Sequence, residues 1–192
     1  MTLWTIQPVY LYEQIMRDGF YRFDESRISK NAWFYCCQVA YNWLAGEMKK
    51  KIGDPPTGVK YPVWAWYKHY SEHKKPDLRR AEYGRKSEKM VCMEIDIPDE
   101  QVVLSDEELW HFVLNNSYLS RAENETDYNN DMRQFEALPE SKKQAEKVRS
   151  WQTIFDIEPV DTEWFKKGRS VQATFWELKA EQIRKVQFFK AR

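Results

Sequence analysis

The clearest alternation of apolar and polar side chains runs from Met90 to Ile97. Successive side chains of a strand point to opposite faces, so this segment would present one apolar and one partly acidic face. The apolar face consists of Val91, Met93, Ile95 and Ile97, and the opposite face of Cys92, Glu94 and Asp96. The pattern predicts a half-buried strand over 90–97 that ends at the Pro98-Asp99 turn.

A helix is predicted soon after this strand. Ser105 followed by Glu108 has the spacing of a capping box, in which each side chain satisfies a free amide at the helix start. Leu104 and Leu109 occupy the two positions of a hydrophobic staple. We therefore expect a helix over 105–115 with Ser105 as its N-cap.

The same periodicities predict the remaining elements. Apolar alternation indicates further strands at 2–7, 20–23, 61–67, 171–178 and 185–189. Helical spacing indicates helices at 8–18, 139–155 and 31–52, the last capped by Asn31. We expect an α+β fold in a single domain over residues 1–192. Its centre would be a mostly antiparallel sheet, with the helices at 31–52 and 105–115 packed on it.

Composition narrows the function classes. The chain carries 30 basic and 30 acidic residues, so no net charge would hold it on nucleic acid. Its three cysteines, an odd number, do not indicate a disulfide framework. No secretory leader pattern opens the sequence, and no apolar run approaches the roughly 18 residues that span a bilayer. We expect a soluble, cytoplasmic protein with no membrane partner.

Aromatic residues make up 16% of the chain, with 9 Trp, 11 Tyr and 10 Phe. Two interpretations compete: a core built on large rings, or a cleft whose rings stack on a base, a nicotinamide or a sugar. Trp64 and Trp66 illustrate the choice, because they fall on one face of the predicted strand at 61–67. A closed core is the default interpretation for any single ring.

The segment 68–89 is polar, without clear periodicity, and its basic residues include Arg79 and Arg80. It is either a solvated loop or a loop that contacts phosphate, since guanidinium groups bind phosphate through two hydrogen bonds. The segment also contains His69, Glu72 and His73 in the H-x-x-E-H pattern of inverted zinc peptidases. That chemistry requires both histidines on one helical face, and Pro76 follows immediately. We therefore interpret the pattern as incidental and predict no metal site.

Four segments together resemble a small bacterial domain family of unknown function over nearly the full length of the chain. They are LWTIQ at 3–7, YPVWAW at 61–66, the strand, turn and capped helix at 90–115, and VQATFWEL at 171–178. The resemblance brings no assigned activity.

The order of the predicted elements is also similar to that of ADP-ribosyltransferases, especially the branch of DNA-modifying toxins. This resemblance implies a histidine or arginine for NAD on the first strand, a tyrosine or serine on a middle strand and a catalytic glutamate on a late strand. The first position falls near Thr5, the second in 61–67 and the glutamate near Thr174, with Gln172 and Glu177 as imperfect substitutes. The chain departs from the pattern at the first and third positions.

These observations predict a cleft for a nucleotide-like ligand, with NAD as the candidate cofactor. Rings would stack on the base, arginines would meet phosphate, and Glu177 would stabilise an oxocarbenium ion as the candidate catalytic acid. The candidate ligand-binding residues are Trp4, Thr5, Gln7, Trp64, Trp66, Arg79, Arg80 and Gln172. The alternative is a non-catalytic module that binds a protein or nucleic acid through exposed aromatics and the basic loop at 68–89. Trp64 and Trp66 in a closed core would remove this platform.

Overall fold

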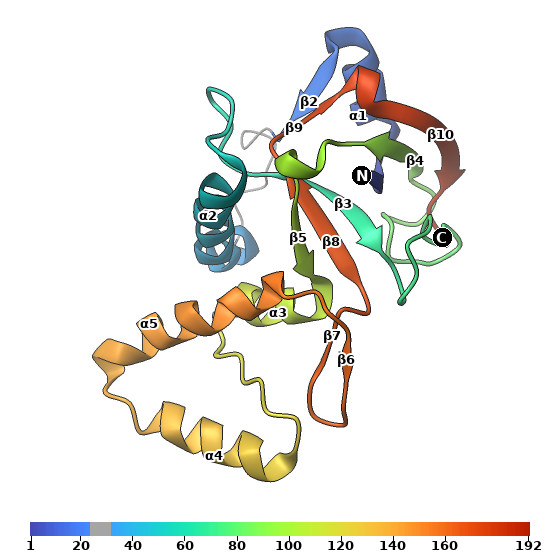
Figure 1. The fold of residues 1–192 in the computed structure, drawn as a ribbon. Coiled ribbons are helices and arrows are strands. Elements are labelled where there is room, and N and C mark those ends of the chain that lie inside the picture. The colour runs from blue at the N-terminus through green and yellow to red at the C-terminus, as the bar shows by residue number, and fades with distance from the viewer. Residues whose placement is uncertain (24–31) are drawn as a thin grey trace.

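The computed structural model describes residues 1–23 and 32–192, with a six-stranded sheet at its centre (Figure 1). The strands are β1 (Thr2–Pro8), β3 (Val63–Lys68), β4 (Lys89–Asp96), β5 (Val103–Asp106), β8 (Val171–Phe175) and β10 (Ile183–Lys190). Their order is β10-β4-β1-β3-β8-β5, and every neighbouring pair is antiparallel. The α+β class and the antiparallel sheet expected from the sequence are therefore confirmed.

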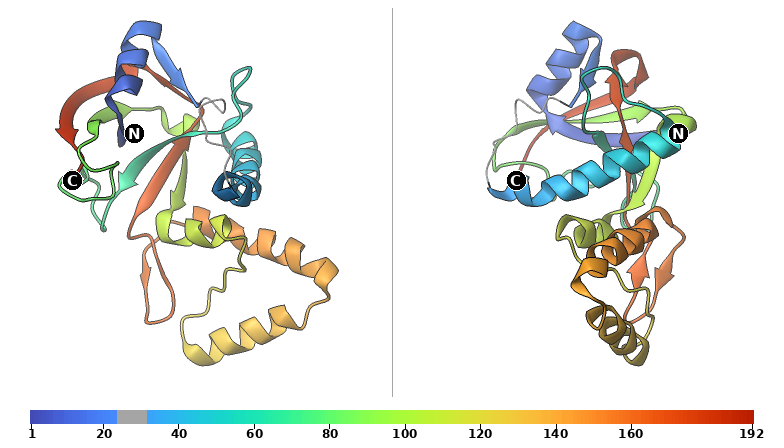
Figure 2. Two further views of the ribbon diagram at one scale, coloured as in Figure 1. Left: turned by 180° about the vertical axis from the view of Figure 1, so that it is seen from behind. Right: turned by 90° about the vertical axis from the view of Figure 1, so that its left-hand side faces the viewer.

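Helices pack around this sheet and extend beyond it. They are α1 (Val9–Asp18), α2 (Ala32–Ile52), α3 (Glu107–Leu114), α4 (Glu125–Glu136) and α5 (Glu140–Ser150), with short 3-10 helices η2 (Asp99–Gln101), η3 (Trp151–Phe155) and η4 (Ala180–Gln182). Helices α4 and α5 form an arm that projects away from the sheet (Figures 1 and 2). No helix in the described segments is long and apolar enough to cross a membrane. The predicted cap Asn31 lies outside the described residues.

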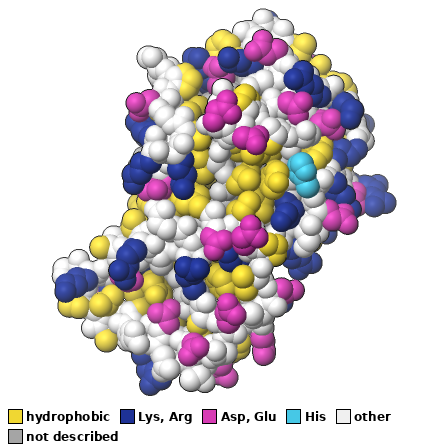
Figure 3. All heavy atoms as spheres, viewed as in Figure 1, with side chains coloured by type: hydrophobic (Ala, Val, Ile, Leu, Met, Phe, Trp, Pro, Cys, Tyr) yellow, Lys and Arg dark blue, Asp and Glu magenta, His cyan; other side chains and the backbone are white. Residues whose placement is uncertain are grey.

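The two faces of the sheet support different cores. The apolar face of β4 is buried as predicted, because Val91, Met93 and Ile95 are fully inaccessible and pack with Ile15 of α1. A second core joins α2, α3 and η3 around Trp151 and the end of the sheet. On the face viewed in Figure 3, apolar side chains gather near the middle of the molecule, with charged side chains of both signs around them.

The predicted strand at 171–178 is wrong in one respect, because the chain forms two strands there. β8 ends at Phe175, and Trp176 leaves the sheet to donate its indole N–H to the carbonyl of Gly53 at 3.0 Å. The next strand, β9 (Glu177–Lys179), pairs with β2 (Phe20–Arg22) in a separate two-stranded sheet. A third small sheet joins β6 (Val160–Asp161) and β7 (Lys166–Lys167). Glu177 is therefore not on a strand of the central sheet.

The predicted N-cap is also wrong, by one residue. Ser105 belongs to β5, and the cap of α3 is Asp106, whose carboxylate accepts the Leu109 N–H at 2.8 Å. The other oxygen of the Asp106 carboxylate accepts the N–H of Gly168. Serine and aspartate are both good caps. The pairing of β5 with β8 holds Ser105 opposite Gln172 and Asp106 opposite Val171, so both residues belong to the strand and the helix begins only after Asp106.

We expect Asp106→Ala to lower the free energy of unfolding by about 3 kcal/mol, because it removes a helix cap and leaves a buried N–H without an acceptor. Ser105→Ala is the matched control. The Ser105 hydroxyl is fully buried and has no hydrogen-bond partner in the described structure, so its loss should leave stability unchanged or slightly raised. Urea denaturation measures both, and a larger loss for Ser105→Ala would restore Ser105 as the cap.

Candidate functional site

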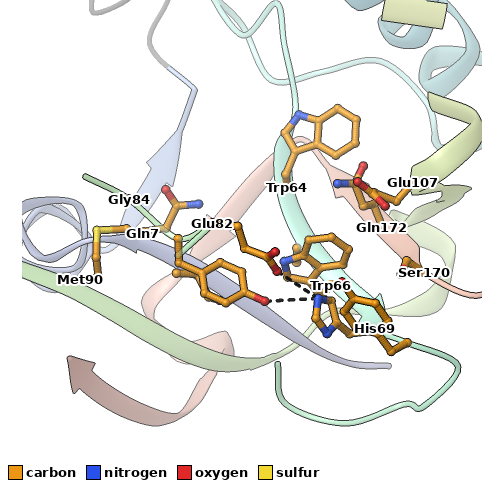
Figure 4. A pocket seen from close by; sticks show the side chains of 14 residues that line it. Gln7, Trp64, Trp66, His69, Glu82, Gly84, Met90, Glu107, Ser170 and Gln172 are labelled. Atoms are coloured by element: carbon orange, nitrogen blue, oxygen red, sulfur yellow. Dashed lines mark hydrogen bonds and ion pairs between the residues drawn. The ribbon is translucent and has the colours of Figure 1, made fainter. Parts of the chain in front are cut away.

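A cavity of about 450 Å³ opens on the face of the sheet that carries Trp64 and Trp66. We call it the cleft, and Figure 4 shows the side chains that line it. Its volume falls within the range of about 300–1,000 Å³ that small-molecule sites occupy. The side chains that matter below are Gln7, Trp64, Trp66, His69, Tyr70, Glu82, Tyr83, Glu107 and Gln172.

The floor of the cleft comes from β3 and β8. Trp66 lies directly opposite Gln172 across this pair, so the indole and the amide are neighbours on one face. Trp64 is supported from the side, because its ring contacts Trp110 at a centroid distance of 5.3 Å and Tyr41 at 6.2 Å. Both indoles on the floor are half-buried. They are therefore neither enclosed in a core nor freely exposed.

One wall of the cleft begins with a tight turn after β3. The N–H of His69 donates to the carbonyl of Glu72 at 2.9 Å, and the two residues between them have positive φ: 51° for Tyr70 and 67° for Ser71. Such left-handed backbone costs non-glycine residues about 1 kcal/mol or more each. The turn is held by the Ser71 N–H, which donates to the carbonyl of Arg169 at 2.6 Å. It fixes the Tyr70 ring at the rim.

His69 is the buried polar group of this wall. Its Nε2 lies 3.2 Å from the Tyr83 hydroxyl and 3.4 Å from a carboxylate oxygen of Glu82. Burial lowers the pKa of His69, and Glu82 opposes this effect without overcoming it. Burial and the neighbouring Glu82 raise the pKa of the Tyr83 hydroxyl. A neutral imidazole and a protonated phenol therefore face each other at neutral pH.

The second histidine of the H-x-x-E-H pattern lies in different surroundings. His73 has its Nε2 2.9 Å from the carbonyl of Thr2, and its ring contacts Trp4 and Tyr67. Because residues 69–72 form a turn, His69 and His73 do not share the helical face that the peptidase pattern requires. No cluster of three or more potential metal ligands occurs among the described residues. The absence of zinc stays a prediction, which elemental analysis of the purified protein would test.

The opposite wall is the start of α3. Glu107 is its first residue and stands beside Gln172 in Figure 4. One carboxylate oxygen of Glu107 lies 3.3 Å from Nε2 of His111. The carbonyl oxygen of the Gln172 side chain is inaccessible to solvent and has no partner within the part of the chain that is described. An unpaired buried acceptor is costly unless a ligand satisfies it.

The structure brings four of the predicted ligand-binding residues to this cleft: Gln7, Trp64, Trp66 and Gln172. Arg80 reaches the rim, where its guanidinium lies 4.0 Å from the centre of the Tyr70 ring. Gln7, Trp66 and Gln172 are far apart in the sequence, and the pairing of β3 with β1 and β8 brings their strands together.

Four other predicted residues lie elsewhere. Trp4 is 7% exposed and packs against His73, while Thr5 is fully buried and donates to the carbonyl of Trp64. The Arg79 guanidinium makes two hydrogen bonds with Asp77 on the surface. Glu177, on β9, forms an ion pair with Arg22 at 2.5 Å. The structure thus does not bring these four into the cleft.

Five of the side chains named above for the cleft are not among the predicted site residues: His69, Tyr70, Glu82, Tyr83 and Glu107. Glu82 and Tyr83 lie in a loop without periodicity, so nothing in the sequence distinguishes them from solvated residues. Glu107 carried a weak signal, since it opens a strongly predicted helix. For His69, the sequence pattern indicates only the H-x-x-E-H match.

Comparison with known proteins places the chain in one family. The family described as Domain of unknown function (DUF3841) matches residues 2–184, and the chain therefore belongs to it. The match covers nearly the whole chain and confirms the resemblance to a family of unknown function. It brings no activity and no link to ADP-ribosyltransferases. No curated protein matches the chain.

The lowered pKa of His69 predicts a pH dependence of stability. The folded state binds this proton less readily than the unfolded state, so the stabilisation from neutral His69 is full above pH 6.5 and is lost as pH falls below it. Thermal midpoints between pH 7.5 and 5 should therefore fall more for the wild type than for His69→Gln. Other titrating groups are common to both proteins. Equal slopes would contradict the assignment.

Ser71→Gly should raise the free energy of unfolding by up to about 1 kcal/mol, because glycine adopts a φ of 67° without a Cβ penalty. The same substitution at Ser141, within α5, should lower stability by about the same amount. Urea denaturation distinguishes these opposite signs. A destabilised Ser71→Gly variant would mean that the turn is not strained.

Proposed function

We propose that the cleft binds a nucleotide-like ligand, whose ring lies against the indoles of Trp64 and Trp66 and whose phosphate reaches the rim. The observation that carries this proposal is the convergence of two half-buried indoles and the amides of Gln7 and Gln172 on one open cavity. Flat rings stack on aromatic side chains, and amide groups can pair with the polar edge of a base.

The rim supports the position of the phosphate. Two guanidiniums lie over the Tyr70 ring, that of Arg80 at 4.0 Å and that of Arg169 at 5.2 Å from its centre. Guanidinium groups bind phosphate oxygens through paired hydrogen bonds. The rim thus supplies positive charge outside the cleft, while the carboxylates lie inside. A nucleotide would enter with its ring first.

NAD is a member of the ligand class proposed here, but no catalytic step on it is assigned. The resemblance to ADP-ribosyltransferases would put their glutamate near Thr174, which is fully buried and donates to the carbonyl of Val103 at 3.2 Å. Glu177 is bound to Arg22 outside the cleft. The carboxylates that line the cleft are Glu82 and Glu107, and the proposal requires only that they contribute to binding.

The alternative, a module that binds nucleic acid or protein, is favoured by the exposure of Tyr70, which is 43% accessible at the rim. It is weakened by the ion pair that Arg79 of the basic loop makes with Asp77. Binding to a nucleic acid would weaken steeply as salt rises, since it depends on counterion release.

Thermal-shift measurements with AMP, ADP-ribose and NAD test the proposal. A ligand that binds only the folded state raises its midpoint, and we expect a rise at millimolar concentration. Trp66→Leu should abolish the shift, because it removes the stacking surface. Trp164→Leu is the matched control, since Trp164 is 41% exposed and lies outside the cleft. No shift with any of these nucleotides, or equal shifts for Trp66→Leu and the wild type, would contradict the proposal.

A further inference from the structure

We propose that the ring held in the cleft is positively charged: an N-alkylated heteroaromatic cation rather than a neutral base. This inference rests on the proposed function and specifies the ligand class for the same site. It follows from the charges that line the cleft, from the rings that surround it and from one unpaired acceptor.

The charged side chains that line the cleft are acidic. Glu82 enters from the segment after the Tyr70 turn and Glu107 from the start of α3, so the two carboxylates approach from different walls (Figure 4). Among the described residues that line the cavity there is no lysine or arginine. A neutral or anionic ring would leave this negative potential uncompensated, whereas a cation would be attracted by both carboxylates.

The two carboxylates differ in how far the protein neutralises them. Glu82 lies near Arg80 at 3.6 Å and near His69 at 3.4 Å. Glu107 has the imidazole of His111 as its described ion-pair partner, at 3.3 Å. Both carboxylates act on His69 in the direction that raises its pKa, against burial, so their fields extend into the cleft. Glu107 is therefore the principal counter-charge for a bound cation.

The aromatic walls suit the same ligand. Indole has the strongest attraction for a cation over its face, and the cleft presents Trp64 and Trp66 together. The protein itself uses this interaction at the rim, where guanidiniums lie over Tyr70. Within the described structure, no lysine or arginine lies over either indole of the floor. Trp66 contacts the His69 ring edge-to-face at a centroid distance of 4.8 Å, and Trp64 contacts Trp110 and Tyr41, so a ligand would meet only the parts of the two indoles that line the cleft.

The unpaired side-chain oxygen of Gln172 favours a ligand ring that carries a hydrogen-bond donor as a substituent. This side-chain carbonyl oxygen is buried and unpaired, and the amide stands next to Trp66 across the strand pair. Rotation of the amide would turn this oxygen toward the cleft, where an N–H donor on the ligand, such as an amino or carboxamide group, would satisfy it. The cleft thus fits a flat cation that bears a donor substituent at its edge.

Two pairs of probes isolate the charge at nearly constant shape. The first pair is 1-methylnicotinamide, a cation, and neutral nicotinamide. The second is nicotinamide mononucleotide and its reduced form, which has a neutral ring, with AMP as a further neutral-ring nucleotide. Calorimetric titration of the full chain gives each dissociation constant. We expect the cationic member of each pair to bind at least tenfold more tightly.

Glu107→Gln should reduce this preference at least fivefold, because it removes charge and keeps shape. The preference is the ratio of the two dissociation constants within a pair, so any effect of the substitution that is common to both members cancels. Glu163→Gln, on the surface between β6 and β7, is the matched control and should keep the preference. Unchanged thermal midpoints confirm that both variants fold.

The remaining outcomes show which of the two proposals fails. Equal binding of charged and neutral probes, or a preference that survives in Glu107→Gln, would overturn the cationic ligand while the nucleotide cleft stands. No binding of any nucleotide would overturn both.

Discussion

The carboxylate of Asp106 is the constraint on which the arrangement of the cleft depends. It is fully buried, and it accepts backbone N–H groups from α3 and from Gly168 at the other end of the chain. Gly168 has a φ of 75°, and a Cβ there would lie 2.6 Å from the carbonyl of Ile157, so no other residue presents this N–H without displacement. Because the N–H of Glu107 donates to the carbonyl of Ser170 at 2.9 Å, the same junction sets the acidic wall of the cleft. Burial raises the pKa of Asp106, while the backbone donors stabilise its charged form.

The sequence predicts the strands near this junction but not the junction itself. The strands of the sheet were predictable because alternation is local, and the buried side of β4 agrees with the pattern residue by residue. The choice between Ser105 and Asp106 as the helix cap was not predictable. Both residues can cap a helix, and the pairing of β5 with the distant strand β8 determines which of them does. The break between β8 and β9 has a similar cause. Trp176 turns out of the sheet toward Gly53, a partner that nothing near Trp176 in the sequence reveals.

The site was predictable to the extent that it lies on strands. Trp64, Trp66 and Gln172 meet because alternation places each on a known face and adjacent strands share that face. For Trp4, strand alternation alone does not predict whether the side chain reaches the cleft. Trp4 lies opposite Trp66 in the register of β1 and β3, yet it is covered by His73 from a loop without periodicity. The residues supplied by loops were accordingly missed or misassigned.

The high aromatic content of the chain is explained mainly by packing. The half-buried indoles of the cleft therefore differ from most of the other rings. Tyr41 contacts Trp64 and Trp110 edge-on, and burial raises the pKa of Tyr41 to about 12, as expected for a phenol in an apolar core. Stability alone would favour glycine in the turn at Tyr70 and a paired acceptor at Gln172. The chain instead keeps backbone strain at the rim and an unpaired oxygen at the floor of one cavity. Such costs also occur elsewhere in the described chain, as at the Ser105 hydroxyl, but at a cavity a ligand can offset what the fold alone does not.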